Sequence, residues 1–213
     1  MIIKLKFIVL LILISALTGF GQQPADDFLS RSVPEMRMAR VGVHQILSRL
    51  SVRYRVPIGF EAIPSETPPQ PNEVISINIE NGTVRDVLNA ITEADSRYRW
   101  EEVDGVINVF PRERQDEILE VVVREFQVNR MPAARVREAI TDLPEVKARL
   151  DSLGVSPLHL TLMPHIRDRS LISLNLRNVT VRDILNEIAR RSTSRYWVVS
   201  KFGDHNEFLI INF

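Results

Sequence analysis

The sequence predicts an α+β fold of two tandem β-α-β-β-α-β-β modules, each a small mixed sheet with helices on one face. Three observations lead to this prediction. A block of seventeen residues occurs twice, and the spacing of apolar residues changes inside each copy from that of a strand to that of a helix. A hairpin pattern then follows each copy.

The repeated block reads ISINIENGTVRDVLNAI at residues 75–91 and ISLNLRNVTVRDILNEI at residues 172–188. Of the seventeen aligned positions, eleven carry the same residue: Ile, Ser, Asn, Asn, Thr, Val, Arg, Asp, Leu, Asn and Ile. We therefore expect both copies to adopt the same secondary structure and to superimpose.

Each block begins as a strand and continues as a helix. Apolar and polar residues first alternate, which is the period of a strand with one buried face. Thr83 and Thr180 then precede Asp86 and Asp183 by three residues, which is the pattern of a capping box. Apolar residues at i, i+3, i+4 and i+7 mark a helix stripe that we expect in the core: Val84, Val87, Leu88 and Ile91, then Val181, Ile184, Leu185 and Ile188.

A hairpin follows each helix. Asp104-Gly105 lies between two runs rich in β-formers, which is a strong two-residue turn signal. A turn near Gly203-Asp204 has the same place in the second half. The predicted hairpin strands are 98–103, 106–110, 195–200 and 208–211.

The segments before each block complete the modules. Proline can start a new first turn of a helix, so the predicted helix at 132–150 should break at Leu143-Pro144. The predicted leading elements are a strand at 36–41, a helix at 43–50 and a strand at 56–60, then a strand at 119–126, a helix at 132–150 and a strand at 158–163.

The N-terminus is typical of a secretory signal peptide. Lys4 and Lys6 precede the apolar run FIVLLILISAL and a region of small residues, with cleavage expected after Gly19 or Gly21. The alternative is a retained membrane anchor, but spanning a membrane needs roughly 20 apolar residues, which is more than this run supplies. We therefore expect a periplasmic or secreted protein with no stable membrane anchor after cleavage, and association with the outer membrane stays open.

The expected organisation along the chain has five parts. Residues 61–71 contain four prolines and should form a stiff, exposed loop within the first module. The parts are a signal peptide at 1–21, a disordered leader at 22–35, a first module at 36–110, a charged linker at 111–117 and a second module at 118–213.

Composition argues against one functional class and bears on what stabilises the fold. The chain has 27 basic and 27 acidic residues, so there is no broad electrostatic reason to expect nucleic acid as a partner. It has no cysteine, so apolar packing rather than disulfides must hold an exported chain together.

Motifs for catalysis are missing from the sequence. There is no G-x-S-x-G, no H-E-x-x-H and no glycine-rich phosphate loop, so we expect no cofactor, no metal and no enzymatic activity. His159 and His165 are close in sequence, but their spacing fits no metal site. Glu101, Glu102 and Asp104 form an acidic cluster. Such carboxylates can serve glycosidic cleavage, but acidic hairpin tips are commonly solvated surface.

Six residues are candidates for binding. An exposed tryptophan stacks well on a sugar ring or a partner chain, and core packing is the alternative. Each arginine could form a polar site with the aspartate that follows it, or be a solvated first-turn residue. Tyr98 and Trp100 are two residues apart and so lie on one strand face, whereas Tyr196 and Trp197 are adjacent and so lie on opposite faces. The candidates are Tyr98, Trp100, Tyr196, Trp197, Arg85 and Arg182.

The order of strand, helix, VPIGFE and ISINIENGTVRDVLNAIT…YRWEEVDGVINVFP resembles the short N-terminal (STN) domain shared by secretins and TonB-dependent receptors. It is also similar to the C-terminal domain of FecR-type anti-sigma regulators. The resemblance rests on the T-x-x-[DE]-x-L helix between a strand and a hairpin. It implies binding to other envelope proteins, with secretins, TonB-dependent receptors and anti-sigma regulators as partner classes.

The sequence therefore favours an exported, non-catalytic envelope protein. A carbohydrate or peptidoglycan binder is the first alternative, and a hydrolase of unrecognised type is the second. A tryptophan exposed in a groove would favour the glycan, an open edge strand would favour a protein partner, and a cleft with convergent carboxylates would favour the enzyme.

Overall fold

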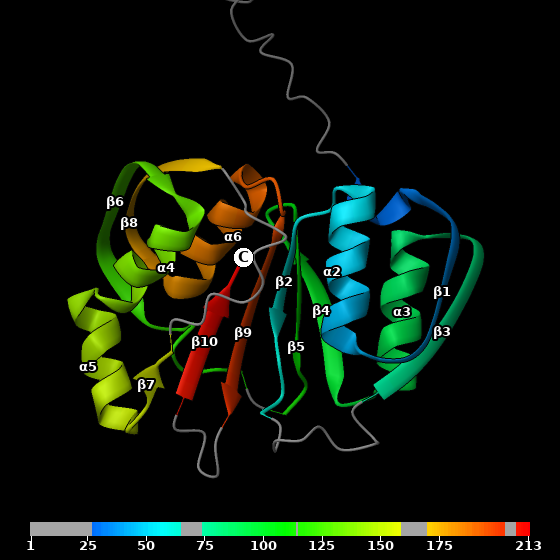
Figure 1. The fold of residues 1–213 in the computed structure, drawn as a ribbon, viewed down its shortest axis with the longest axis horizontal. Helices are drawn as coiled ribbons and strands as arrows, with labels where there is room; N and C mark the ends of the chain where they lie inside the picture. The colour runs from blue at the N-terminus through cyan, green and yellow to red at the C-terminus, as the bar shows by residue number, and fades with distance from the viewer. Residues whose placement is uncertain (1–26, 65–73, 114, 159–169, 203–207) are drawn as a thin grey trace, which may run out of the picture.

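The structure, a computed structural model, describes residues 27–64, 74–113, 115–158, 170–202 and 208–213 (Figure 1). It shows a mixed α/β protein. The first half of the chain forms η1 (Phe28–Ser30), β1 (Ser32–Gly42), α2 (Val43–Tyr54), β2 (Ile58–Glu61), β3 (Val74–Thr83), α3 (Val84–Ala94), β4 (Tyr98–Val103) and β5 (Val106–Pro111). The second half forms β6 (Val122–Pro132), α4 (Ala133–Thr141), α5 (Pro144–Leu153), β7 (Ser156–Pro157), β8 (Leu171–Thr180), α6 (Val181–Arg191), β9 (Tyr196–Phe202) and β10 (Phe208–Asn212).

Both copies of the repeated block form a strand followed by a helix, as predicted. The capping boxes are present. The Asp86 N–H donates to Thr83 Oγ1 at 3.3 Å, and the Asp183 N–H donates to Thr180 Oγ1 at 3.1 Å. In return each aspartate accepts from the backbone N–H of its threonine, which satisfies donors that a helix N-terminus leaves open.

Other identical residues of the repeat also have local roles. Asn81 and Asn178 have φ values of 52° and 51°, in the left-handed region that asparagine tolerates better than most residues. Ser76 Oγ accepts a hydrogen bond from the Arg40 N–H, and Ser173 Oγ accepts one from the Arg130 N–H, each at a register shift in the partner strand. Much of the repeat is therefore explained by local folding.

The sheets differ from the prediction. Strands from both halves form one six-stranded sheet in the order β4-β5-β2-β9-β10-β7, and β1-β3 and β6-β8 form separate antiparallel pairs. The two halves join where β2 runs parallel to β9. The expectation that each half has a sheet of its own is wrong, because β2 and β9 pair through main-chain groups that the hydrophobic pattern does not reveal.

Helices cover both faces of the six-stranded sheet (Figure 1). One apolar core lies with α2 and α3, and the other lies with α4, α5 and α6. Successive side chains of a strand point to opposite faces, and β9 contributes to both cores: Tyr196 belongs to the first and Trp197 to the second. The expectation of helices on one face therefore fails for the whole sheet.

Several predicted boundaries also need correction. Residues 28–35 are not a disordered leader, because Leu29 and Val33 are buried in the first core. The linker prediction is also revised. Pro111 ends β5, and the Asp116 N–H donates to the Glu61 carboxylate. The predicted strand at 119–126 begins at Val122 and runs to Pro132, whereas the helix break at Leu143-Pro144 is confirmed.

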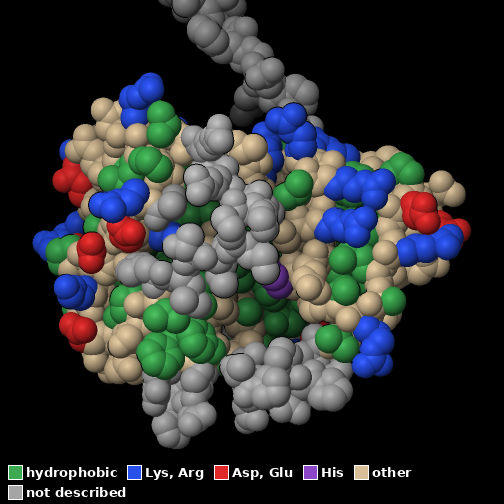
Figure 2. Space-filling view, in the orientation of Figure 1, with side chains coloured by type: hydrophobic (Ala, Val, Ile, Leu, Met, Phe, Trp, Pro, Cys, Tyr) green, Lys and Arg blue, Asp and Glu red, His purple; other side chains and the backbone are tan. Residues whose placement is uncertain are grey.

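Some expectations fall on residues that are not described. They are the signal peptide, most of the proline-rich loop, almost all of the predicted strand at 158–163, the turn near Gly203-Asp204, His159 and His165. Among the described residues, no helix has the length and apolar character that crossing a membrane requires. Acidic and basic side chains mix over much of the visible surface, and Lys and Arg side chains gather over the region of α2 (Figure 2).

Candidate functional site

The junction between β2 and β9 depends on a glycine. Gly59 lies opposite Trp197 in the parallel register. A Cβ added at Gly59 would lie 2.2 Å from Trp197 Cζ2, which is far inside van der Waals contact. The indole of Trp197 therefore covers the main chain of β2 at Gly59, and it is 0 % exposed.

A hydrogen bond from α6 positions the indole. Trp197 Nε1 donates to Asn186 Oδ1 at 2.9 Å, and both side chains are buried. A buried indole N–H needs an acceptor. Asn186 supplies it and thereby orients the ring toward the neighbouring strand.

An ion pair fastens the end of β2. Arg182 Nη2, in the first turn of α6, lies 2.5 Å from Glu61 Oε1 and 2.8 Å from Glu120 Oε1. Glu61 is two residues after Gly59 and therefore shares its strand face. The Glu61 side chain is 2 % exposed and that of Arg182 is 13 % exposed, so water screens this pair little.

The pKa values of the pair reflect burial and mutual attraction. Burial raises the pKa of Glu61, and the neighbouring Arg182 only partly opposes this effect. Burial by itself would lower the pKa of Arg182, but Glu61 and Glu120 outweigh it and raise that pKa. Removal of Arg182 would leave Glu61 with an uncompensated buried charge.

Arg182, Asn186 and Trp197, which we call the inner set, thus hold a strand that comes from the other half of the chain. Their counterparts in the first half are Arg85, Asn89 and Trp100, which we call the outer set. The three separations, 182 − 85, 186 − 89 and 197 − 100, all equal 97 residues.

The outer set repeats the key hydrogen bond. Trp100 Nε1 donates to Asn89 Oδ1 at 3.2 Å, as Trp197 does to Asn186. The exposed Arg85 places its Cζ 5.7 Å from the centroid of the Trp100 ring, a cation–π contact. Trp100 is only half-buried, because in the described part of the chain no strand pairs with the outer side of β4.

The ladder shows which main-chain groups of β4 face outward. The Arg112 N–H donates to the directly opposite Arg97 carbonyl at 2.7 Å, so these residues form a hydrogen-bonded pair. Such pairs recur at every second residue of an antiparallel ladder. The N–H and C=O groups of Trp100 and Glu102 consequently point away from β5, toward the open side of the sheet.

The two tyrosine candidates are core residues. Tyr98 packs its ring 5.3 Å from that of Phe60, and its hydroxyl accepts a hydrogen bond from the Ile63 N–H. The Tyr196 hydroxyl lies 2.7 Å from His44 Nδ1, and burial raises the Tyr196 pKa well above its usual value. In this structure Tyr98, Tyr196 and Trp197 are not accessible to a ligand, whereas Trp100 and Arg85 are.

Arg85 and Arg182 do not pair with the aspartates that follow them. Asp86 and Asp183 bind the capping threonines, and this bonding lowers the pKa of Asp86. The acidic residues Glu101, Glu102 and Asp104 are exposed at the hairpin. No group of three side chains suited to a metal ion occurs among the described residues.

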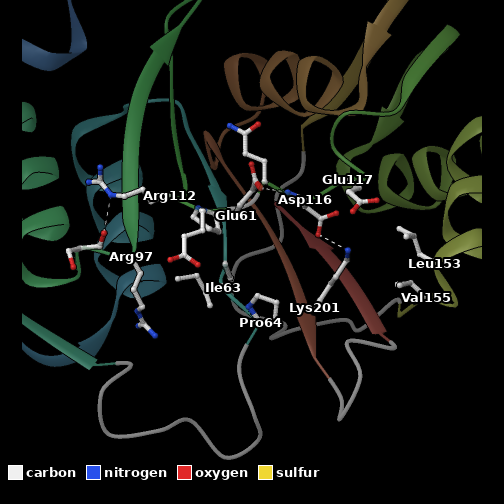
Figure 3. Close-up of a pocket in the computed structure, with 15 residues that line it drawn as sticks. Glu61, Ile63, Pro64, Arg97, Arg112, Asp116, Glu117, Leu153, Val155 and Lys201 are labelled. Atoms are coloured by element: carbon white, nitrogen blue, oxygen red, sulfur yellow. Dashed lines mark hydrogen bonds and ion pairs between the residues drawn. The ribbon is translucent and has the colours of Figure 1, made fainter.

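A cavity of about 690 Å³ opens where the two halves meet (Figure 3). Its lining includes the acidic residues Glu61, Asp116 and Glu117. Lys201, which also lines the cavity, pairs with Asp116 at 3.1 Å. Both Glu61 oxygens are engaged, one by Arg182 and one by the Asp116 N–H at 2.7 Å. A carboxylate held in this way is suited to fastening the junction and poorly suited to exchanging protons with a substrate.

Sequence reasoning missed four of these residues: Gly59, Glu61, Asn89 and Asn186. The two asparagines are identical positions of the repeat on otherwise amphipathic helices, and that identity was a usable signal. No local sequence pattern marks Gly59 or Glu61 as functional, because their roles depend on β9, which is distant in sequence. No family model, curated protein or solved structure matches this chain.

Proposed function

We propose that this chain is an exported, non-catalytic protein of the cell envelope, built from two tandem STN-like modules. It binds other envelope proteins by accepting an extended segment of the partner at the outer side of β4. Secretins, TonB-dependent receptors and anti-sigma regulators are the partner classes that the resemblance implies.

One observation carries this proposal: among the described residues β4 presents unpaired main-chain groups at the edge of a sheet, whereas its counterpart β9 is paired with β2. Strand addition at an open edge supplies main-chain hydrogen bonds for affinity, and neighbouring side chains supply selectivity. The exposed charges of Arg99, Glu101 and Glu102 protect such an edge from indiscriminate pairing.

A glycan-binding function is the second candidate, because the half-buried Trp100 offers part of an aromatic face. Arg85 already lies over that ring, and Asn89 holds its N–H. With these two contacts the indole is better placed to cover a protein strand than to stack on a sugar ring.

The test uses the full exported chain with a photoreactive residue in place of Glu101 on β4. The control carries the same residue in place of Lys147, which is exposed on α5. Irradiation of source-organism envelopes should link the β4 probe, and not the α5 probe, to a discrete protein.

A second change tests strand addition itself. Glu102→Pro removes an outward N–H and spares the β4–β5 ladder, so it should abolish the cross-link, whereas Glu102→Ala should preserve it. Equal cross-linking from both probe positions, or indifference to Glu102→Pro, would refute binding at this edge. Retention of the chain on insoluble peptidoglycan without any protein adduct would favour the glycan-binding function.

A further inference from the structure

We infer that the outer set selects a parallel strand with glycine opposite Trp100, preceded by an acidic residue and followed by a basic one. This inference rests on the proposed function and specifies the segment that β4 accepts. The β2–β9 junction provides the template for the glycine, and the charges exposed on β4 provide the flanking residues.

The glycine requirement follows from the inner set. Trp197, held by Asn186, lies over Gly59 so closely that no side chain fits beneath it. Trp100 makes the equivalent hydrogen bond to Asn89 from the equivalent strand. A strand that adds to β4 as β2 adds to β9 therefore passes beneath Trp100, where only glycine avoids the ring.

The register of the template identifies the flanking positions. Ile58 lies opposite Tyr196 and Phe60 lies opposite Val198, and both pairs are packed in the core under α2 and α3. On β4 the equivalent positions are Arg99 (196 − 97) and Glu101 (198 − 97), and both are exposed. The apolar flanks of Gly59 are thus replaced by charge at the outer edge.

Opposite charges on directly neighbouring strands are favourable. An acidic residue before the glycine faces Arg99, and a basic residue after it faces Glu101. The next position corresponds to Glu61, which lies opposite Val199 and pairs with Arg182. The equivalents of these two residues in the first half are Glu102 and Arg85, whose charges have opposite signs, so this position has no charge preference. The preferred core of the partner segment is acidic–Gly–basic.

The experiment measures binding of the synthetic peptide TVEGKVT to the mature chain. The chain has two tryptophans, and Trp197 is fully buried, so a change in indole emission reports chiefly on Trp100. We expect a saturable blue shift at peptide concentrations up to the millimolar range, and its absence in Trp100→Phe. Chemical-shift changes confined to β4 should accompany it.

Two control peptides test the two parts of the preference. TVELKVT places leucine beneath the indole and should bind at least about tenfold more weakly, as overpacking predicts. TVKGEVT reverses both charges and should bind about threefold more weakly, because exposed cross-strand pairs are individually modest. The variant with both Arg99→Glu and Glu101→Arg should reverse that order, provided that its circular dichroism matches the wild type.

Several results would overturn the inference. They are the absence of saturable binding at millimolar peptide, equal affinity for TVEGKVT and TVELKVT, a signal that persists in Trp100→Phe, and a charge preference that does not reverse in the swapped variant. Cross-linking of an envelope protein at β4 without these peptide preferences would leave the proposed function standing and reject only this inference. Selective peptide binding without any envelope adduct would reject the proposed function and leave this inference standing.

Discussion

Among single residues, Gly59 and Trp197 do most to determine how the two halves of the chain meet. The ring of Trp197 occupies the space that a side chain at position 59 would need. Asn186 holds the indole N–H, so the ring cannot turn away without leaving a buried donor unpaired. The contact is therefore rigid, and small changes in volume should be costly.

Gly59→Ala should destabilise the protein by about 1–3 kcal/mol, the usual range for overpacking a rigid core. Urea unfolding of residues 22–213 measures the change. The matched control is Gly42→Ser, because apart from the adjacent residues no described residue lies within 4 Å of an added Cβ there, and serine is a good N-cap. Equal stability of the two variants would show that the Trp197 ring moves freely.

His44 gives the junction a dependence on pH. Its ring contacts Tyr196 across the two halves. Part of the His44 side chain is exposed, but the protein around the ring removes enough water from it to lower the pKa of His44 below the usual 6.5. In the window just below pH 6.5 the unfolded chain therefore binds more protons than the folded chain. The stability that neutral His44 provides is present above this window and is lost as the pH falls through it.

We expect the wild type to lose more free energy of unfolding between pH 7 and pH 5.5 than His44→Gln does. Glutamine keeps an acceptor for the Tyr196 hydroxyl but does not titrate. Carboxylates with lowered pKa values, such as Asp95, act at lower pH and do not overlap this window. Identical slopes for the two proteins would assign the pH dependence to other groups.

The repeated strand and helix are the elements that the sequence specifies most completely. Alternation, cap and helix stripe all point to one structure, and agreement among such local signals favours a single fold. The two copies have the same elements of the same lengths, β3 with α3 and β8 with α6. Each helix buries its stripe in a different core.

Leu88→Ala and Leu185→Ala should each cost about 2–5 kcal/mol, because both side chains are almost fully buried on these stripes. Thermal and urea unfolding measure the loss. Val52→Ala is the control, since Val52 is 55 % exposed on α2 and its truncation should change stability by less than about 0.5 kcal/mol. Melting temperatures unchanged from wild type would place the leucines on the wrong helix face.

For the molecule as a whole, the decisive feature is that one sheet passes through both halves. β2 is paired on one side with β5 of its own half and on the other with β9. The buried pair Glu61–Arg182 reinforces the same junction, as does the Ser51 hydroxyl, whose Oγ lies within hydrogen-bond distance of the Ser194 and Arg195 carbonyl oxygens. The two halves should therefore behave as one cooperative unit.

Residues 22–114 and 115–213, expressed separately, should each melt below the intact chain. Each fragment carries one tryptophan. Trp197 loses the cover of β2 in the second fragment, so its emission should shift to longer wavelength, and addition of the first fragment should reverse the shift. Fragments that melt like the intact chain and do not associate would mean that the junction contributes little.

The sequence by itself determined the order of elements, the capped helices and most of the apolar core. These features depend on neighbours in sequence, because alternation, helix stripes and caps act over a few residues. It also identified candidate binding residues. Trp100 and Arg85 are accessible in the structure, whereas Tyr98, Tyr196 and Trp197 are core residues.

Only the tertiary structure decided which strand edges are used and which stay open. The pairing of β2 with β9 joins Gly59 to Trp197 and Glu61 to Arg182, residues more than a hundred positions apart. Main-chain hydrogen bonds between strands carry no residue code of their own, so no local pattern reveals such a partner. The same pairing buries the inner set, whereas in the described part of the chain no strand covers its copy on β4, and identical sequence motifs thereby acquire different environments.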